Sequence, residues 1–123
     1  MCFGYYKDNR PHIEAVVISP EVANPISVEF MIDTGSDITA ISLIDALKLG
    51  VNISEITSRE ETQLVGVSGT TNMHPIYNVF LIFKDYSEVL DKFSYHGEFL
   101  EKIYLVPTLP QSVLGRDVLD SLI

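Results

Sequence analysis

The clearest pattern along the chain is an alternation of period two that leads up to an acidic residue. From residue 26 to residue 33, one set of positions is wholly apolar (Ile26, Val28, Phe30, Ile32), and the set between them is Ser27, Glu29, Met31 and Asp33. Such an alternation is typical of a strand with one buried face. The pattern therefore predicts a strand that ends at Asp33 and leaves its carboxylate next to a hydrophobic core.

Four more stretches have the length and the apolar content of strands, namely residues 12–18, 62–67, 75–83 and 101–106. Residues 19–25 are rich in turn-forming residues and are predicted to connect the first two strands. Residues 84–98 are polar and charged with interspersed aromatic side chains, so the pattern there is ambiguous. We interpret them as an excursion between two strands.

Two short segments have helical spacing instead. Ser42 is a candidate N-cap, with Asp45 three residues later in place of the usual Glu of a capping box. Leu43, Ala46 and Leu47 would then share the apolar face, and Gly50 would end the helix. Near the end of the chain, the apolar residues Val118, Leu119 and Leu122 are also spaced as on one helix face. The predicted fold class is mainly β with one or two short helices.

Length and composition favour one domain covering residues 1–123, because a chain of this length with 46% hydrophobic residues has little room for a second core. No apolar run approaches the roughly 20 residues needed to cross a bilayer, and the N-terminus lacks a signal-peptide pattern. Cys2 is the only cysteine, so no intrachain disulfide can form. We expect a cytoplasmic protein without a membrane association.

The charge distribution argues against several kinds of ligand. The formal net charge is −9, and the eight basic residues are scattered, whereas nucleic-acid binders group Lys and Arg on one face. The three histidines lie far apart in the sequence, and Asp33 and Asp37 lack the further oxygen ligands of a divalent-cation site. We therefore expect no nucleic acid, no metal and no cofactor.

The segment Asp33-Thr34-Gly35-Ser36 carries the candidate chemistry. Gly35 allows a sharp turn directly after the strand, and the hydroxyl groups of Thr34 and Ser36 can donate hydrogen bonds near the acid. An ordinary turn at this position is the alternative.

Together with the apolar residues that precede it from Phe30 onward, this segment resembles the signature of the aspartic proteases, an apolar stretch followed by Asp-Thr-Gly-Ser or Asp-Thr-Gly-Ala. The residues that follow, 38–42, are also similar to that family. The family uses two aspartates, but this chain has a single Asp-Thr-Gly. The resemblance is therefore to the retropepsin-like enzymes, and it implies a closed or partly open β-barrel-like fold and a twofold homodimer that shares one site.

Two other blocks support this resemblance. Residues 112–119 are similar to the retropepsin segment in which two apolar residues, Gly, Arg and Asn or Asp precede a short helix. In that family the Arg pairs with the acid four residues after the catalytic one, which implies a buried pair between Arg116 and Asp37. Gly66, Val67, Ser68 and Gly69 stand where the family has its flap, a β-hairpin that closes over substrate. A surface Arg and a plain hairpin turn are the alternatives for these two blocks.

The function implied is that of an aspartic endopeptidase, with Asp33, Thr34 and Gly35 as catalytic residues and Ser36, Asp37 and Arg116 in support. Water held between two carboxylates that share one proton would attack the peptide bond, and an acidic pH optimum follows. Ser36 could donate a hydrogen bond to the ionised carboxylate. An extended peptide would bind against the flap, with Ile38, Val67 and Val113 as candidate pocket residues.

A second reading is a peptide-binding or dimerisation module of the same fold with little or no turnover. The chain stops soon after Arg116, where viral enzymes continue into a strand that builds the dimer interface. A dimer of this chain would therefore have to use another surface or associate weakly.

Overall fold

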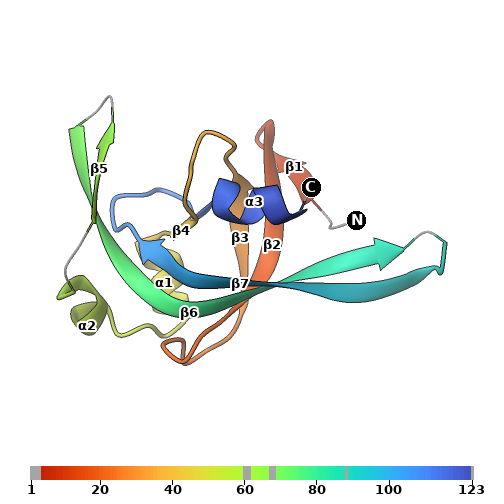
Figure 1. Cartoon of the computed structure of the whole chain (residues 1–123), viewed down its shortest axis with the longest axis horizontal. Coiled ribbons are helices and arrows are strands. Elements are labelled where there is room, and N and C mark those ends of the chain that lie inside the picture. Colours follow the sequence, from red (N-terminus) through yellow and green to blue (C-terminus); the bar gives the residue numbers. More distant parts are fainter. Residues whose placement is uncertain (1–3, 60–61, 67–68, 88, 123) are drawn as a thin grey trace.

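The computed structural model describes residues 4–59, 62–66, 69–87 and 89–122 as a curved sheet with short helices at its edges (Figure 1). The strands are β1 (Gly4–Lys7), β2 (Arg10–Ile18), β3 (Ser27–Ile32), β4 (Ala40–Ile41), β5 (Thr62–Gly66), β6 (Gly69–Ser87), β7 (Lys92–Leu105) and β8 (Val113–Leu114). The helices are α1 (Leu43–Lys48), α2 (Ile53–Thr57) and α3 (Arg116–Leu122). The mainly β prediction is confirmed, and the described part has three helices where one or two were expected.

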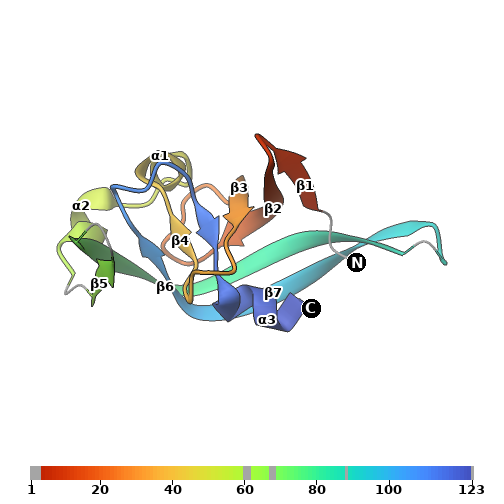
Figure 2. The ribbon, with the colours of Figure 1, turned by 90° about the horizontal axis from the view of Figure 1, so that it is seen from above.

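Six of the strands close a ring. Strand β2 pairs antiparallel with both β3 and β6. From β3 the ring continues through β8 and β4 to β7, which returns to β6. Strands β1 and β5 extend it at β2 and β6, and Figure 2 shows the curved sheet from above. The barrel-like prediction holds in this looser form, because β4 and β8 have only two residues each.

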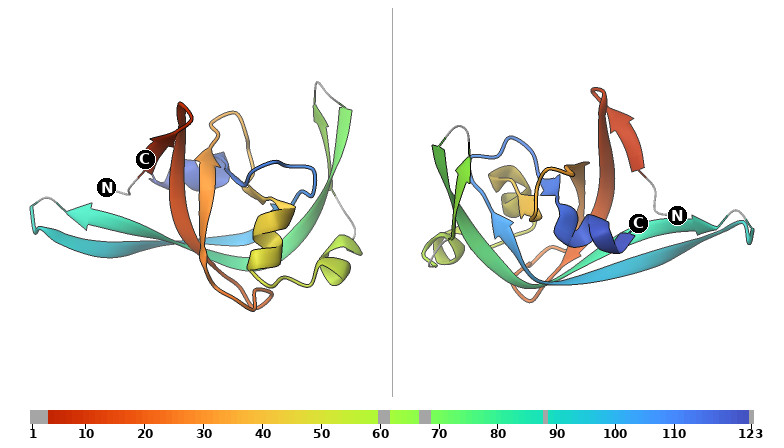
Figure 3. Two further views of the ribbon diagram at one scale, coloured as in Figure 1. Left: turned by 180° about the vertical axis from the view of Figure 1, so that it is seen from behind. Right: turned by 45° about the horizontal axis from the view of Figure 1, so that its top comes forward.

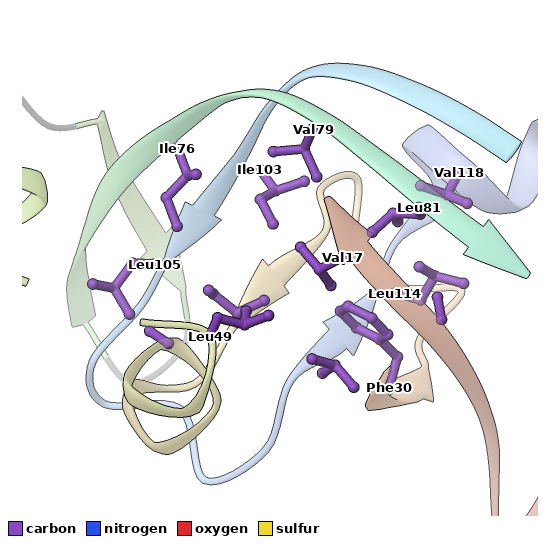
Figure 4. Packing of buried hydrophobic residues seen from close by; sticks show 14 of the residues in the cluster. Val17, Phe30, Leu49, Ile76, Val79, Leu81, Ile103, Leu105, Leu114 and Val118 are labelled. Carbon is purple, nitrogen blue, oxygen red and sulfur yellow. The ribbon is translucent and has the colours of Figure 1, made fainter. Parts of the chain in front are cut away.

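The core lies inside this ring. Val28 and Phe30 are buried as the alternation predicted, and Figure 4 shows Phe30 packed with Val17 and Leu114. In β6 the buried residues Ile76 and Val79 are three positions apart, which a regular strand would place on opposite faces. Asn78 between them has a φ of 56°, a left-handed conformation that rotates the strand and returns Val79 to the core.

Residues 84–98 form part of a long hairpin. Strands β6 and β7 stay paired as far as Ser87 and Lys92, and Figure 3 shows this end of the hairpin projecting beyond the rest of the sheet. The aromatic side chains of Phe93 and Tyr95 are exposed, with Tyr95 at 74%. The sequence did not predict strands here because this end of the hairpin lacks the buried face that produces a clean alternation.

The helix starts follow the sequence more closely than the helix faces do. Ser42 caps α1, and its Oγ accepts from the Asp45 amide at 3.2 Å, which confirms the predicted cap. Gly50 ends the turn with a φ of 70°. The prediction that Leu47 faces the core was wrong, since its side chain is 60% exposed while Leu49 is fully buried. Because α1 ends at Lys48, Leu49 does not have to follow the helical spacing and its side chain can pack into the core.

Strand β4, helix α2 and strand β1 were not predicted as such from the sequence. Helix α2, capped by Asn52, has only five residues, which is too short to display a helical period. Strand β1 has four residues and is exposed along its whole length, so it lacks an apolar face. In the structure β1 pairs with β2, and α2 contacts β6.

Candidate active site

Asp33 follows directly on β3, and its position is set by the parallel pairing of β3 with β8. Ile32 is in register with Leu114, and the Asp33 amide donates to the Leu114 carbonyl at 3.0 Å. The chain then turns back on itself, because the Gly35 amide donates to Asp33 Oδ1 at 3.0 Å and the Ser36 amide to the Asp33 carbonyl at 3.2 Å. The backbone and carboxylate of Asp33 are therefore oriented by three hydrogen bonds.

The loop after Asp33 is held by the start of α3. A helix leaves its first amide groups without partners inside the helix. In α3 two of these groups bond to the loop: the Arg116 amide donates to the Ser36 carbonyl at 2.8 Å, and the Asp117 amide donates to the Asp37 carbonyl at 3.3 Å. Segments nearly 80 positions apart in the sequence thus form one unit.

Gly115 lets these two segments approach each other. A β-carbon at this position would lie 2.2 Å from the carbonyl oxygen of Ile38. No side chain larger than hydrogen fits at that distance, and the obstacle is backbone, which cannot rotate away. Glycine is therefore required by the packing of the loop against α3.

Thr39 and Asp117 form a buried link that sequence reasoning missed. Thr39 is fully buried, and its Oγ1 donates to Asp117 Oδ1 at 2.7 Å while accepting from the Gly115 amide at 3.1 Å. The Thr39 amide donates to the other carboxylate oxygen, Oδ2, at 2.9 Å. The signal for this link in the sequence is weak, because Thr39 and Asp117 each appear only as one polar residue within an apolar run.

We expect Thr39→Val to destabilise the protein by about 1–3 kcal/mol, because the change keeps the shape but leaves the Gly115 amide and one Asp117 oxygen without a partner. Chemical denaturation of the two proteins measures the difference. Thr57→Val is the control, since Thr57 Oγ1 donates to carbonyls of its own helix, such as that of Ile53 at 2.7 Å. Equal stabilities for both variants would contradict a structural role for the Thr39 hydroxyl.

Arg116 and Asp37 form the ion pair that the resemblance implies, but the pair is not buried. Arg116 Nη2 donates to Asp37 Oδ1, and the two side chains remain 55% and 78% exposed. This hydrogen bond is the main cause of the raised pKa of Arg116. The expected burial was wrong because both residues lie on the outer side of the contact between the loop and α3.

The other residues of the motif are placed as follows. Thr34 and Gly35 are exposed at the turn. The hydroxyl of Ser36 donates to the Ile38 carbonyl at 2.8 Å, so it stabilises the loop and does not bond to the Asp33 carboxylate as anticipated.

A small apolar cluster lies next to the loop. It consists of Ala40, Met73, Tyr104, Val106 and Val113, with Met31, Ile38 and Leu109 packed against it. Two of the predicted pocket residues, Ile38 and Val113, are thus together. Met73 belongs to β6 where that strand leaves the β5–β6 hairpin, so the cluster connects the strand of Asp33 with the base of the hairpin.

The β5–β6 hairpin matches the predicted flap in position along the chain. Gly66 and Gly69 form its last strand pair, while Val67 and Ser68 lie outside the described residues. The hairpin and the loop between β3 and β4 project from the same side of the molecule in Figures 1 and 3.

In the single chain, a polar hollow lies elsewhere. It has a volume of about 720 Å³ and lies between the β1–β2 hairpin and α1, and its lining includes His12, Glu29 and Asp45 but not Asp33.

Within the described ranges, no group of three or more His, Cys, Asp or Glu side chains is placed to hold a metal ion. No helix in that part of the chain is long and apolar enough to span a membrane.

Comparison with known proteins supports the fold. No protein-family model and no curated protein sequence matches the chain. Among solved structures, a retropepsin-like aspartic protease from Rickettsia conorii matches with a TM-score of 0.63 and 22% identity, over 98% of this chain and 85% of that one. The EIAV protease in complex with an inhibitor matches with a TM-score of 0.50 and 17% identity, over 96% of this chain and 92% of that one. The chain therefore has a retropepsin-like fold.

Proposed function

We propose that this chain is an aspartic endopeptidase that acts as a twofold homodimer, with Asp33 of each copy supplying one of two catalytic carboxylates. The observation that carries the proposal is the geometry of Asp33, a carboxylate at the end of a core strand whose Oδ1 accepts from the Gly35 amide at 3.0 Å. The retropepsin-like fold supports the same reading, since both similar structures are proteases by name.

A second copy is needed because one chain holds half of the chemistry. The sequence contains a single Asp-Thr-Gly. A twofold axis beside the turn would bring two Asp33 carboxylates together, with Thr34 and Gly35, which are exposed in the single chain, facing their equivalents.

In such a pair, one Asp33 is ionised and the other is protonated. The ionised carboxylate takes a proton from water as the water oxygen attacks the carbonyl carbon of the peptide bond, and the protonated carboxyl gives its proton to the carbonyl oxygen. As the diol collapses, the carboxyl that now holds the proton gives it to the amide nitrogen, the other carboxylate takes a proton from a diol hydroxyl, and the C–N bond breaks. The pair returns to its starting state with one proton, without any cofactor.

Substrate would bind as an extended peptide between the turn and the β5–β6 hairpin. The backbone of Gly35 and of the hairpin can bond to the peptide backbone, and apolar side chains can pack near Ile38 and Val113. We propose an acidic pH optimum, because the pair must retain one proton and because a dimer of chains with a net charge of −9 is less repulsive at low pH.

Dilution tests this function. Cleavage of a mixed peptide library is measured at pH 4–6 over a wide range of protein concentrations, and sedimentation of the same samples gives the dimer fraction. Below the dissociation constant we expect the activity per chain to fall about tenfold for each tenfold dilution, since the dimer fraction falls in proportion. Constant activity per chain in a monomeric sample would refute the shared site, and peptide binding without cleavage would identify a binding module.

A further inference from the structure

Three segments of the chain meet in a compact ionic contact at the base of the β5–β6 hairpin. They are the turn after β2, the residues just after α2 and the part of β6 just beyond the hairpin. We call the contact between Arg59, Glu21 and the backbone of Pro75 and Tyr77 the hairpin-base clamp.

Arg59 is the centre of the clamp. Its Nη1 donates to Glu21 Oε2 at 2.9 Å and to the Pro75 carbonyl at 2.9 Å, and its Nη2 donates to Glu21 Oε1. The guanidinium group also lies 5.4 Å from the centre of the Tyr77 ring. The two-pronged pairing of Arg with a carboxylate fixes direction as well as distance.

Glu21 is itself held in place from two sides. Its Oε2 accepts from the Tyr77 amide at 2.9 Å, and its own amide donates to Ser19 Oγ at 3.1 Å. The Ser19 hydroxyl in turn donates to the Tyr77 carbonyl at 2.9 Å. The turn after β2 is therefore bound to both polar groups of the Tyr77 backbone.

The clamp lies where β6 changes its partner. Strand β6 pairs with β5 as far as Met73 and with β7 from His74 onward. The clamp holds β6 at Pro75 and Tyr77, directly after this change, and Arg59 precedes the first residue of β5 by three positions. Both strands of the hairpin are thus fixed at their common base.

Burial distinguishes the clamp from the ion pair between Arg116 and Asp37. The side chains of Arg59 and Glu21 are 21% and 24% exposed, against 55% and 78% for Arg116 and Asp37. The hydrogen bond from Arg59 is the main cause of the lowered pKa of Glu21. A partly buried and multiply bonded pair contributes more to local structure than an exposed one.

We propose that the hairpin-base clamp is a positioning device that sets how the β5–β6 hairpin stands relative to Asp33. The expected effect of the clamp on peptide cleavage rests on the proposed function, whereas its effect on the position of the hairpin does not. Arg59 and Glu21 are positioning residues, since the clamp acts through the hairpin. Loosening the clamp should weaken substrate binding while leaving the Asp33 chemistry intact.

The test is Glu21→Gln, which keeps the shape of the side chain and an acceptor for the Tyr77 amide but removes the charge that pairs with Arg59. Glu29→Gln is the matched control, because Glu29 accepts from Tyr5 and Lys7 on β1 and has no bond to the described residues of the hairpin. Amide hydrogen exchange is followed along β5 and the first part of β6. We expect exchange there to be about fivefold to tenfold faster in Glu21→Gln, with the main sheet unchanged.

Peptide cleavage supplies the second measurement. We expect Glu21→Gln to raise KM several-fold with kcat within about twofold, and Glu29→Gln to change neither. Unchanged exchange in the hairpin, or equally faster exchange throughout the sheet, would overturn the clamp, as would a loss confined to kcat. If the unaltered protein cleaves nothing, the proposed function fails, and hydrogen exchange alone decides on the clamp.

Discussion

Replacement of Asp33 by Asn is expected to reduce peptide cleavage by about a thousandfold or more, while the fold and the dimer remain. The amide oxygen of Asn can still accept from the Gly35 amide, which holds the turn through Asp33 Oδ1. What is lost is the ability to take a proton from water and return it, and positioned acid–base groups contribute roughly 10²–10⁴-fold to rates. Cleavage of a peptide library at pH 4–6 measures the loss, and thermal unfolding verifies the fold.

Asp8→Asn is the matched control for this change. Asp8 is exposed in the turn between β1 and β2, and its φ of 53° is a conformation that Asn adopts readily. Cleavage should be unaffected there. Equal cleavage by the unaltered protein and both variants would assign the activity to a contaminant. In a second test, an excess of Asp33→Asn chains is mixed with the unaltered protein. Undiminished cleavage by this mixture would argue against a shared pair.

Gly115→Ala is expected to lower stability by about 3 kcal/mol or more and to abolish cleavage with it. The added β-carbon would lie 2.2 Å from the Ile38 carbonyl oxygen, so the loop after Asp33 must separate from the start of α3. Overpacking in a well-packed interior typically costs about 1–3 kcal/mol, and backbone obstacles place this site at the upper end. The unfolding temperature should fall by roughly 10 °C.

Gly97→Ala is the corresponding control, because the same methyl group is added to β7 at a solvent-exposed position. The nearest atom to the new β-carbon would be Ile82 Cδ1 at 3.3 Å, the far end of a flexible side chain. We expect a change within about 1 kcal/mol of either sign. A Gly115→Ala protein as stable and active as the control would show that the loop does not depend on close contact with α3.

Local sequence predicted those parts of the fold whose signal lies within a few residues. The alternation before Asp33 gave β3, and the pair of Ser42 and Asp45 gave the start of α1. Where burial has no regular period, prediction failed. Leu47 was assigned to the core although it is exposed, and the end of the β6–β7 hairpin lacks a buried face to mark it as strand.

The candidate site also has features that local sequence predicted and features that it did not. The turn at Asp33 could be predicted from neighbouring residues, because Gly35 allows a sharp turn and the adjacent hydroxyl groups can form hydrogen bonds near the acid. The bonds from Thr39 to Asp117 could not, because they join residues 78 positions apart. The Ser36 hydroxyl was assigned to the wrong acceptor for a different reason, since the Asp33 carboxylate and the Ile38 carbonyl are both close in sequence and only the folded loop decides between them.

The sequence by itself thus determined that a carboxylate ends a core strand in an Asp-Thr-Gly turn, and that one chain carries a single such turn. The tertiary structure decided what holds that turn, through the β8 backbone, the first amides of α3 and the space left by Gly115. It also decided that Arg59 and Glu21 meet at the base of the hairpin. Period and turn chemistry act over neighbouring residues, whereas hydrogen bonds between distant segments exist only after the ring of strands has brought them together.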